Sequence, residues 1–240
     1  MLNKEKNCKW IFGTQDDVNV KGPNNPTMMS FKDEDFHSLV RESIQNSLDA
    51  VDDKSQPVNV SFAVRQFDGM EYPSFFDLYK HIQGCLDKFP VQGEPLFKPM
   101  LSYFASSPLN QKINYLRITD SNTKGMGYDS NDAKSGFYKF IAEGVAQDAE
   151  GAGGAFGFGK NAFWSLSPIS TVFVSSQAKN GEGGFAGISK LCTHIVDGKI
   201  LLPYGKYTSN GEVVLTKKED IPETFIPKET GTSVFVLGIN

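Results

Sequence analysis

Five short segments with the composition of β-strands follow one another in the last third of the chain. They cover residues 170–175, 184–191, 199–202, 213–215 and 233–237, and turn-forming residues separate them. Because short turns join neighbouring strands that run in opposite directions, we predict mostly antiparallel pairing in this part of the chain. Two earlier strands are predicted at residues 58–64, where apolar residues alternate, and at residues 114–119, directly before Asp120.

Helical patterns lie between and before these strands. Ser30, with Asp33 three residues later, resembles a helix-capping signal, and a helix is predicted from there to about Asp53. Six of its residues recur at helical spacing and are predicted to face the core: Phe36, Val40, Ile44, Ser47, Leu48 and Val51. Further helices are predicted at residues 75–89, 135–146 and 160–166. Prolines punctuate the remainder of residues 67–112, which we interpret as an insertion between two strands of the core domain.

Composition limits the class of protein. A chain of 240 residues with 39% hydrophobic residues is long enough for one large domain with a real core. The net charge of -4 argues against a generally basic surface that would clamp nucleic acid. No apolar run approaches the roughly 20 residues that span a bilayer, and the first ten residues are too polar for a signal peptide. The three cysteines are widely spaced and lack zinc-ligand spacing with the histidines, which favours a cytoplasmic protein with reduced thiols.

A polar stripe marks the first predicted helix. Glu42, Asn46 and Asp49 stand at positions i, i+4 and i+7, so they cluster on one side of a helix. The plainest interpretation is a solvated face, because most surface helices are amphipathic. Two details favour a functional stripe: asparagine is a weaker helix former than lysine or glutamine, and small residues that would admit a ligand flank it, namely Ser43, Ser47 and Ala50.

Asp120 ends an apolar strand and is followed by a polar loop that contains Gly125, Met126 and Gly127. A carboxylate in this position can accept a hydrogen bond from an exocyclic amine, and glycines let the backbone approach a flat ligand. An ordinary Asx turn after a strand is the alternative interpretation.

A glycine cluster from Gly151 to Gly159 precedes the helix predicted at residues 160–166. Backbone N–H groups at the start of a helix form an anion site, so phosphate is a natural ligand. Gly154, Gly159 and Lys160 nearly spell a P-loop, but Asn161 stands where that motif has serine or threonine. The residues before the cluster are polar and helical in character, whereas a P-loop and a dinucleotide fingerprint both need a preceding buried strand.

Taken together, these segments resemble the GHKL ATPase superfamily, which comprises the DNA gyrase B subunit, the ninety-kilodalton heat-shock chaperones, histidine kinases and MutL. Residues 39–50 resemble the N box, residues 120–127 the first glycine box, residues 154–159 the second, and residues 229–236 the closing Gly-Thr box. The four motifs occur in the family's order. One departure is that Asn122 stands where the family has the first glycine, and Gly125 comes one residue late; asparagine can also adopt a positive φ.

The resemblance implies a fold and a set of residue roles. The fold would be α+β, a two-layer α/β sandwich of the Bergerat type with a mixed, mostly antiparallel sheet and helices on one face. Glu42 would be the general base, and Asn46 would hold Mg²⁺. Asp120 would bind the adenine amine with support from Thr232. The remaining nucleotide contacts would come from Asp49, Ala50, Gly125, Met126, Gly127, Gly154, Gly157, Gly159 and Lys160.

The resemblance also implies how the protein works. Residues 1–240 would be a single ATP-binding domain, the N-terminal part of a larger protein, with a lid at residues 128–153. It would bind ATP or ADP with Mg²⁺, hydrolyse ATP slowly, dimerise on ATP binding and act on a downstream effector domain or client. It would have no membrane contact, and any nucleic-acid contact would come through other domains.

Three other functions compete with this switch. A nucleotide-gated binding module with little turnover would not need Glu42 as a base. A histidine kinase would need its phosphoacceptor on a separate helix, whereas His37 lies only five residues before Glu42 on the same one. A function on DNA, like that of topoisomerases or MutL, is not supported by the acidic net charge of this chain.

Overall fold

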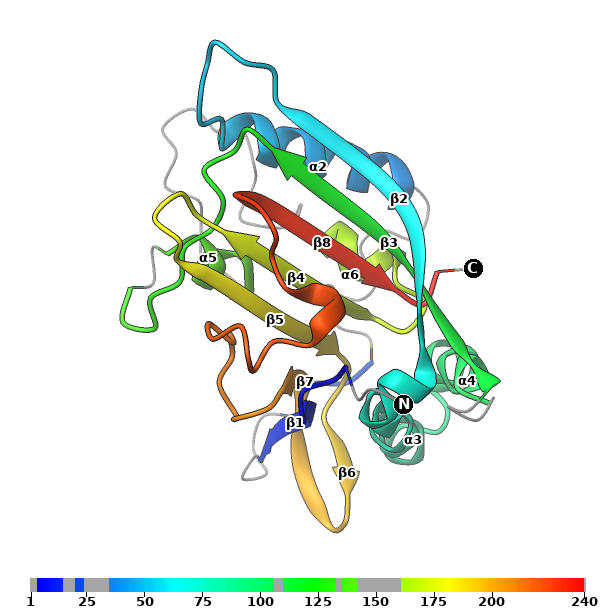
Figure 1. The fold of residues 1–240 in the computed structure, drawn as a ribbon. Helices are drawn as coiled ribbons and strands as arrows, with labels where there is room; N and C mark the ends of the chain where they lie inside the picture. The colour runs from blue at the N-terminus through cyan, green and yellow to red at the C-terminus, as the bar shows by residue number, and fades with distance from the viewer. Residues whose placement is uncertain are drawn as a thin grey trace.

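The computed structural model describes residues 4–14, 20–23, 35–105, 110–132, 135–141 and 161–239. Within these ranges one open sheet of eight strands runs through the molecule in the order β1-β7-β5-β4-β8-β3-β2, with β6 paired to β7 (Figure 1). Every pairing between its strands is antiparallel. The strands are β1 (Lys9–Thr14), β2 (Asn59–Asp68), β3 (Lys112–Ser121), β4 (Thr171–Gln177), β5 (Gly183–Lys190), β6 (His194–Val196), β7 (Lys199–Thr208) and β8 (Gly231–Leu237).

One face of the sheet carries α2 (Asp35–Asp49), α5 (Gly136–Ile141) and α6 (Asn161–Leu166). Because side chains alternate along a strand, every second residue of β3, β4 and β8 points to these helices. The strand residues on this face are aliphatic: Leu116, Ile118, Val172, Val174, Val234 and Val236. The predicted α+β sandwich with a largely antiparallel sheet is therefore confirmed.

The opposite face is aromatic, and the inserted segment covers part of it. Four elements outside the sheet contribute residues to this second core: η2 (Pro73–Asp77), α3 (Leu78–Lys88), α4 (Glu94–Tyr103) and η4 (Glu223–Phe225). The short helix η1 (Gly69–Glu71) precedes η2. Phe173, Tyr207 and Phe235 point to it from the sheet. The expectation of helices on one face thus describes α2, α5 and α6, whereas the helices of the insertion pack on the other face.

β2 and β3 explain how the insertion fits. They pair without interruption from Asn59 opposite Ser121 to Asp68 opposite Lys112, so the chain leaves the sheet and returns at one point. The prolines of this segment do not prevent a second helix, α4, which the sequence did not predict. Pro95 lies in its first turn, where a missing N–H costs nothing, and the buried Phe97 and Met100 anchor the helix although Pro99 lies inside it.

The predicted core face of α2 is wrong at three of its six residues: Phe36, Ile44 and Leu48 are 58%, 41% and 53% exposed. Ser47 is buried as predicted, and Leu39 and Ser43 are buried beside it. On this buried side of the helix, the hydroxyl of Ser47 lies 3.2 Å from the carboxylate of Asp120. Hydrophobic periodicity cannot detect this arrangement, since it assumes that the most apolar side of a helix is the buried one.

The C-terminal strands differ from the predicted ones in two places. Residues 213–215 do not form a strand; only an isolated bridge joins Leu215 to Phe185. The strand predicted at residues 199–202 continues to Thr208, and it forms a hairpin with β6 through Asp197 and Gly198, whose φ angles are 50° and 72°. Positive φ at both central residues is typical of the tight hairpin turn that Asp-Gly favours.

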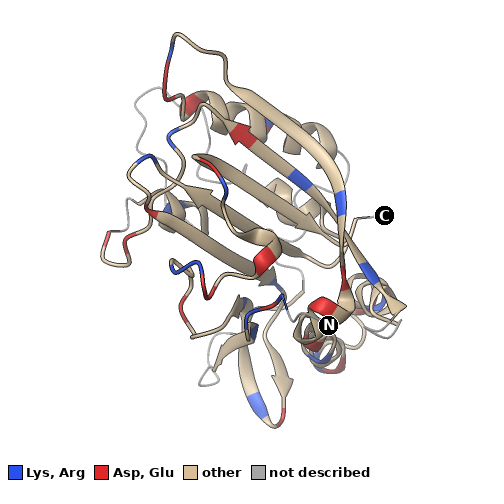
Figure 2. Ribbon diagram, viewed as in Figure 1, with Lys and Arg blue, Asp and Glu red and all other residues tan. Residues whose placement is uncertain are grey.

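Charged residues of both signs are interspersed over the described molecule (Figure 2). No helix among the described residues is both long enough and apolar enough to cross a membrane.

Candidate functional site

The carboxylate of Asp120, at the end of β3, is the point where four segments of the chain meet. Its Oδ1 accepts hydrogen bonds from the backbone N–H of Thr232 and from the hydroxyl of Thr123, both at 2.7 Å. Its Oδ2 lies 3.2 Å from the hydroxyl of Ser47 on α2, whose single proton is shared with the carbonyl of Ser43 at 2.9 Å. The predicted N box, first glycine box and Gly-Thr box are thus joined through one side chain.

Gly231 allows β8 to start beside this carboxylate. Its φ is +131°, and a Cβ atom there would lie 2.6 Å from the backbone oxygen of Asp120. Only glycine accommodates both conditions without a shift of the backbone. The glycine of the Gly-Thr pair therefore lets β3 and β8 approach closely enough for the N–H of Thr232 to reach Asp120.

Ser176, at the end of β4, extends the polar cluster. Its hydroxyl donates to the carbonyl of Gly231 at 2.8 Å and accepts from the N–H of Met126 at 2.7 Å. The hydroxyl of Thr232 lies 2.9 Å from it. Sequence reasoning missed Ser176 and Thr123 as site residues, because a single hydroxyl at the end of a strand carries no motif.

The loop after Asp120 is held against the end of α2. Asn122, which stands where the family has a glycine, adopts a positive φ of +57°, as the sequence allowed. Its side-chain amide donates to the carbonyls of Asp53 and Gln56, both at 2.9 Å. The N–H of Lys124 donates to the carbonyl of Ala50 at 2.8 Å. Gly125, with a φ of +64°, passes so close to Gln177 that a Cβ atom would lie 2.1 Å from its carbonyl oxygen. These contacts hold the loop between the end of α2 and the end of β4.

Glu42 and Asn46 lie together on α2, and both are half-buried. The amide of Asn46 donates to Oε1 of Glu42 at 3.1 Å. Burial raises the pKa of Glu42 above its ordinary value, the hydrogen bond from Asn46 opposes that rise, and the negative charge of Asp49 adds to it. Asp49 itself is exposed and accepts a hydrogen bond from Gln45 at 2.8 Å, so no contact joins it to Asp120.

The remaining predicted residues divide into two groups. Met126 packs against the aliphatic core between sheet and helices, and the carbonyl of Gly127 accepts from the N–H of Phe137. The second group, Gly154, Gly157, Gly159 and Lys160, lies outside the described residues. Much of the predicted lid at residues 128–153 also lies outside them.

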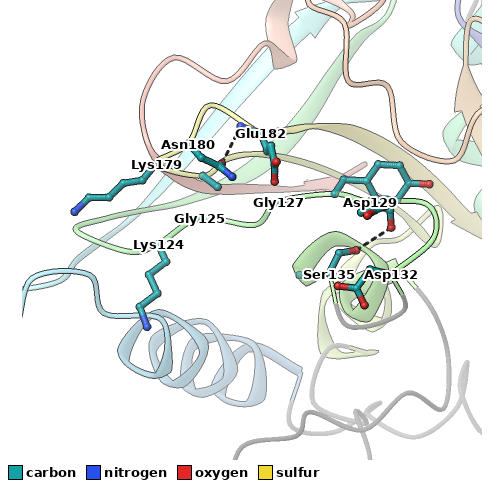
Figure 3. Close-up of a pocket in the computed structure, with 12 residues that line it drawn as sticks. Lys124, Gly125, Gly127, Asp129, Asp132, Ser135, Lys179, Asn180 and Glu182 are labelled. Atoms are coloured by element: carbon teal, nitrogen blue, oxygen red, sulfur yellow. Dashed lines mark hydrogen bonds between the residues drawn. The ribbon is translucent and has the colours of Figure 1, made fainter.

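A pocket of about 560 Å³ lies between two parts of the chain (Figure 3). One is the end of the first glycine box with the described residues that follow it, 124–132 and 135–136, and the other is the turn that joins β4 to β5. Asp129 and Glu182 line it, but Asp120 and Thr232 do not. An ion pair of 2.6 Å between Lys179 and Asp52 ties that turn to the segment after α2. The described residues contain no group of three His, Cys, Asp or Glu side chains placed to hold a metal ion.

The fold and the site define an α+β sandwich protein with a carboxylate-centred polar cluster between a sheet end and a helix. No protein-family model matches this chain, and no curated protein matches it.

Proposed function

We propose that this chain binds ATP with Mg²⁺ and hydrolyses it slowly, as a GHKL-type switch domain. Closure and dimerisation on ATP would act on an effector domain or a client protein. One observation carries the proposal: Ser47, Thr123 and Thr232 hold the Asp120 carboxylate from three different segments, at the junction of the predicted nucleotide motifs.

The hydrogen bonds of Asp120 fit an adenine ligand. Oδ1 already accepts two short bonds, whereas among the described residues Oδ2 has only the 3.2 Å contact with the hydroxyl of Ser47. An ionised carboxylate has about four acceptor positions, so Oδ2 keeps capacity for a further donor such as an exocyclic amine. The hydroxyl of Ser176 already donates to the carbonyl of Gly231, so of the two neighbouring hydroxyls that of Thr232 is the one that could donate to a ring nitrogen of a purine.

The other end of the proposed site lies further along α2. Glu42 precedes Ser47 by five residues, which is about 7.5 Å along a helix axis. The raised pKa of Glu42 brings it closer to the range in which a carboxylate works as a general base for water. The hydrogen bond from Asn46 orients this carboxylate.

Asn46 also fits the role of a metal ligand. Its amide nitrogen is used by Glu42, which leaves the carbonyl oxygen for a hard cation such as Mg²⁺. When bound, Mg²⁺ neutralises charge on the phosphates. The chain's own contributions are the orientation of Glu42 and the acceptance of a proton from water at its carboxylate.

A matched pair of variants tests the proposal. Asp120→Asn keeps the shape and the bonds from Thr123 and Thr232, but it places an N–H₂ group where the adenine amine would donate. We expect this variant to lose the thermal stabilisation by ATP and Mg²⁺, which is about 2.7 kcal/mol for the unmodified protein at 100 times the dissociation constant. Asp87→Asn, on the exposed side of α3, is the control and keeps the full shift.

Glu42→Gln separates the switch ATPase from the binding module with little turnover. We expect this variant to retain the ATP-dependent thermal shift and to lose about 10²–10⁴-fold in hydrolysis rate. Unchanged turnover in Glu42→Gln would remove Glu42 from the catalytic role. The absence of a thermal shift at millimolar ATP in the unmodified protein would refute nucleotide binding as a whole.

A further inference from the structure

Two arginines lie side by side on the sheet face opposite to α2. The chain has only three arginines, Arg41, Arg65 and Arg117, among 24 basic residues. Arg65 lies on β2 opposite Tyr115, and Arg117 lies on β3 opposite Ala63. They are therefore diagonal neighbours whose side chains leave the same face of the sheet, and Figure 2 shows the two strands that carry them next to each other at its edge.

Neither arginine has an acidic partner in the part of the chain that the structure describes, where the three ion pairs all involve lysine. Like charges repel, and diagonal neighbours on adjacent strands lie within reach of long side chains. The Nε atom of Arg117 is moreover buried and makes no hydrogen bond. A buried, unpaired guanidinium N–H is costly, and such an orphan in a folded protein calls for a specific explanation such as a missing ion.

The surroundings of the two arginines are rich in hydroxyl groups. Thr119 follows Arg117 by two residues on the same face, and its hydroxyl lies 2.9 Å from that of Ser233 on β8. Ser61, directly opposite Thr119 on β2, is exposed. Burial raises the pKa of Tyr115, and the positive charges of Arg117 and Arg65 oppose that rise. Both guanidinium groups are therefore close enough to Tyr115 to influence its ionisation.

We propose that Arg65 and Arg117 form a binding site for a phosphomonoester or an equivalent doubly charged oxyanion. Two guanidinium groups balance the charge of one phosphomonoester, which is about -1.5 to -2 at pH 7. Their planar forks match the tetrahedral oxygens of phosphate better than an ammonium group does, and the nearby hydroxyls add further donors. The site is independent of the proposed nucleotide site, because Asp120 points to the α2 face whereas Arg117 and Thr119 point away from it.

Arginine-specific labelling tests this site with an internal control. The intact protein is treated with phenylglyoxal at pH 8, with inorganic phosphate or with chloride at equal ionic strength, and labelling is read by peptide mass spectrometry. We expect phosphate to slow the labelling of Arg65 and Arg117 about fivefold or more, while Arg41 on α2 reacts at an unchanged rate. Protection of Arg41 alone would place phosphate in the proposed nucleotide site and would overturn the arginine site, as would equal protection of all three.

Substitutions distinguish anion binding from a structural role. Arg117→Met removes the orphaned N–H, so without phosphate we expect an equal or higher melting temperature, and with phosphate no further rise. Arg117→Lys keeps the charge but loses the fork, and it retains less than half of the rise that phosphate gives the unmodified protein. A lowered melting temperature in Arg117→Met with an intact phosphate response would assign Arg117 to packing and refute the proposal.

A comparison of probes identifies the source of the phosphoryl group. A tripeptide with a central phosphoserine that protects both arginines at a lower concentration than inorganic phosphate points to a phosphorylated partner protein. Equal potency of the two probes points to a free phosphate ester. The unphosphorylated tripeptide must not protect Arg65 and Arg117 from labelling. If it protects them as well as the phosphorylated one does, the site does not recognise the phosphoryl group and the proposal fails.

Discussion

The two faces of the sheet are stabilised by different interactions. On the face that the insertion covers, aromatic rings surround Phe225, which is completely buried; most of them meet it edge to face, whereas Phe185 stacks on it and Tyr72 is tilted. Six rings have centroids within 6.2 Å of it: Phe67, Tyr72, Tyr115, Phe173, Phe185 and Phe235. On the α2 face, aliphatic strand residues and the rings of Phe137, Phe163 and Trp164 share the interior with three buried, hydrogen-bonded hydroxyl residues: Ser43, Ser47 and Thr123.

This difference indicates that one face of the sheet provides the proposed binding site and the other contributes mainly to stability. Burying a polar group costs free energy unless it is hydrogen-bonded, and even then its net contribution is modest. Aromatic burial contributes more per residue. The α2 face therefore carries the polar groups that a binding site requires, while the aromatic face supplies much of the stability that holds them in place.

The largest expected effect comes from the centre of the aromatic face. Phe225→Ala removes the ring that six others contact, so we expect a loss of about 3–5 kcal/mol in the free energy of unfolding. Urea denaturation followed by fluorescence measures it. At low urea the folded fraction should bind ATP with unchanged affinity. A loss of affinity without a loss of stability would contradict the proposed division between the faces.

Gly231→Ala should affect both stability and the site. A Cβ atom 2.6 Å from the backbone oxygen of Asp120, at a φ of +131°, forces β3 and β8 apart. We expect a cost of about 1–3 kcal/mol together with a weaker ATP-dependent thermal shift. Gly211→Ala is the control, because Gly211 also has a positive φ, +85°, but has no atom within 4 Å of the added Cβ. The control should lose a little stability and keep the full thermal shift.

A histidine pair makes the aromatic face sensitive to acid. Nδ1 of the buried His81 lies 2.9 Å from Nε2 of His194, and the ring of Phe12 stacks on His81. Burial, together with the charges of His194 and Lys80, lowers the pKa of His81 to about 3. Below the ordinary histidine pKa of about 6.5, the unfolded chain binds a proton at His81 that the folded protein does not bind. The free energy of unfolding therefore decreases as the pH is lowered from about 6.5 to 3.

This linkage predicts a loss of about 2 kcal/mol from His81 alone between pH 7 and pH 5, and burial lowers the pKa of His194 as well. Urea denaturation at several pH values measures the slope. His81→Phe removes the titrating group and retains an aromatic ring against Phe12, so its slope should be smaller. An identical slope in this variant would show that other groups cause the acid sensitivity.

The sequence predicted the sheet better than it predicted the interior of the site. Alternation located β2, and β-rich composition between turn-forming residues located β3, β4, β5 and β8 to within a few residues, because both patterns are local signals. The same signals failed at α4, where tertiary contacts of Phe97 and Met100 outweigh the prolines. They also failed at residues 213–215, whose apolar composition serves packing rather than strand pairing.

Within the site, the motifs led to Asp120 and Thr232, which the structure joins directly. They did not lead to Ser176, since its position between Met126 and Gly231 arises only when β4 and β8 pair. Hydrophobic periodicity placed both Ser47 and Leu48 on the core face of α2, but only Ser47 is buried although Leu48 is the more hydrophobic. Long-range hydrogen bonds decide such cases, and a single sequence contains no local trace of them.

The smallest expected effect tests this corrected orientation of α2. Leu48 is 53% exposed, so Leu48→Gln should change the free energy of unfolding by no more than about 0.5 kcal/mol. Leu39 is completely buried on the same helix, and Leu39→Ala should cost about 2–5 kcal/mol because it leaves a cavity against the aliphatic core. Urea denaturation of both variants measures the contrast within one helix. If Leu48→Gln costs as much as Leu39→Ala, the apolar side of α2 faces the core after all, and Ser47 is not directed at Asp120.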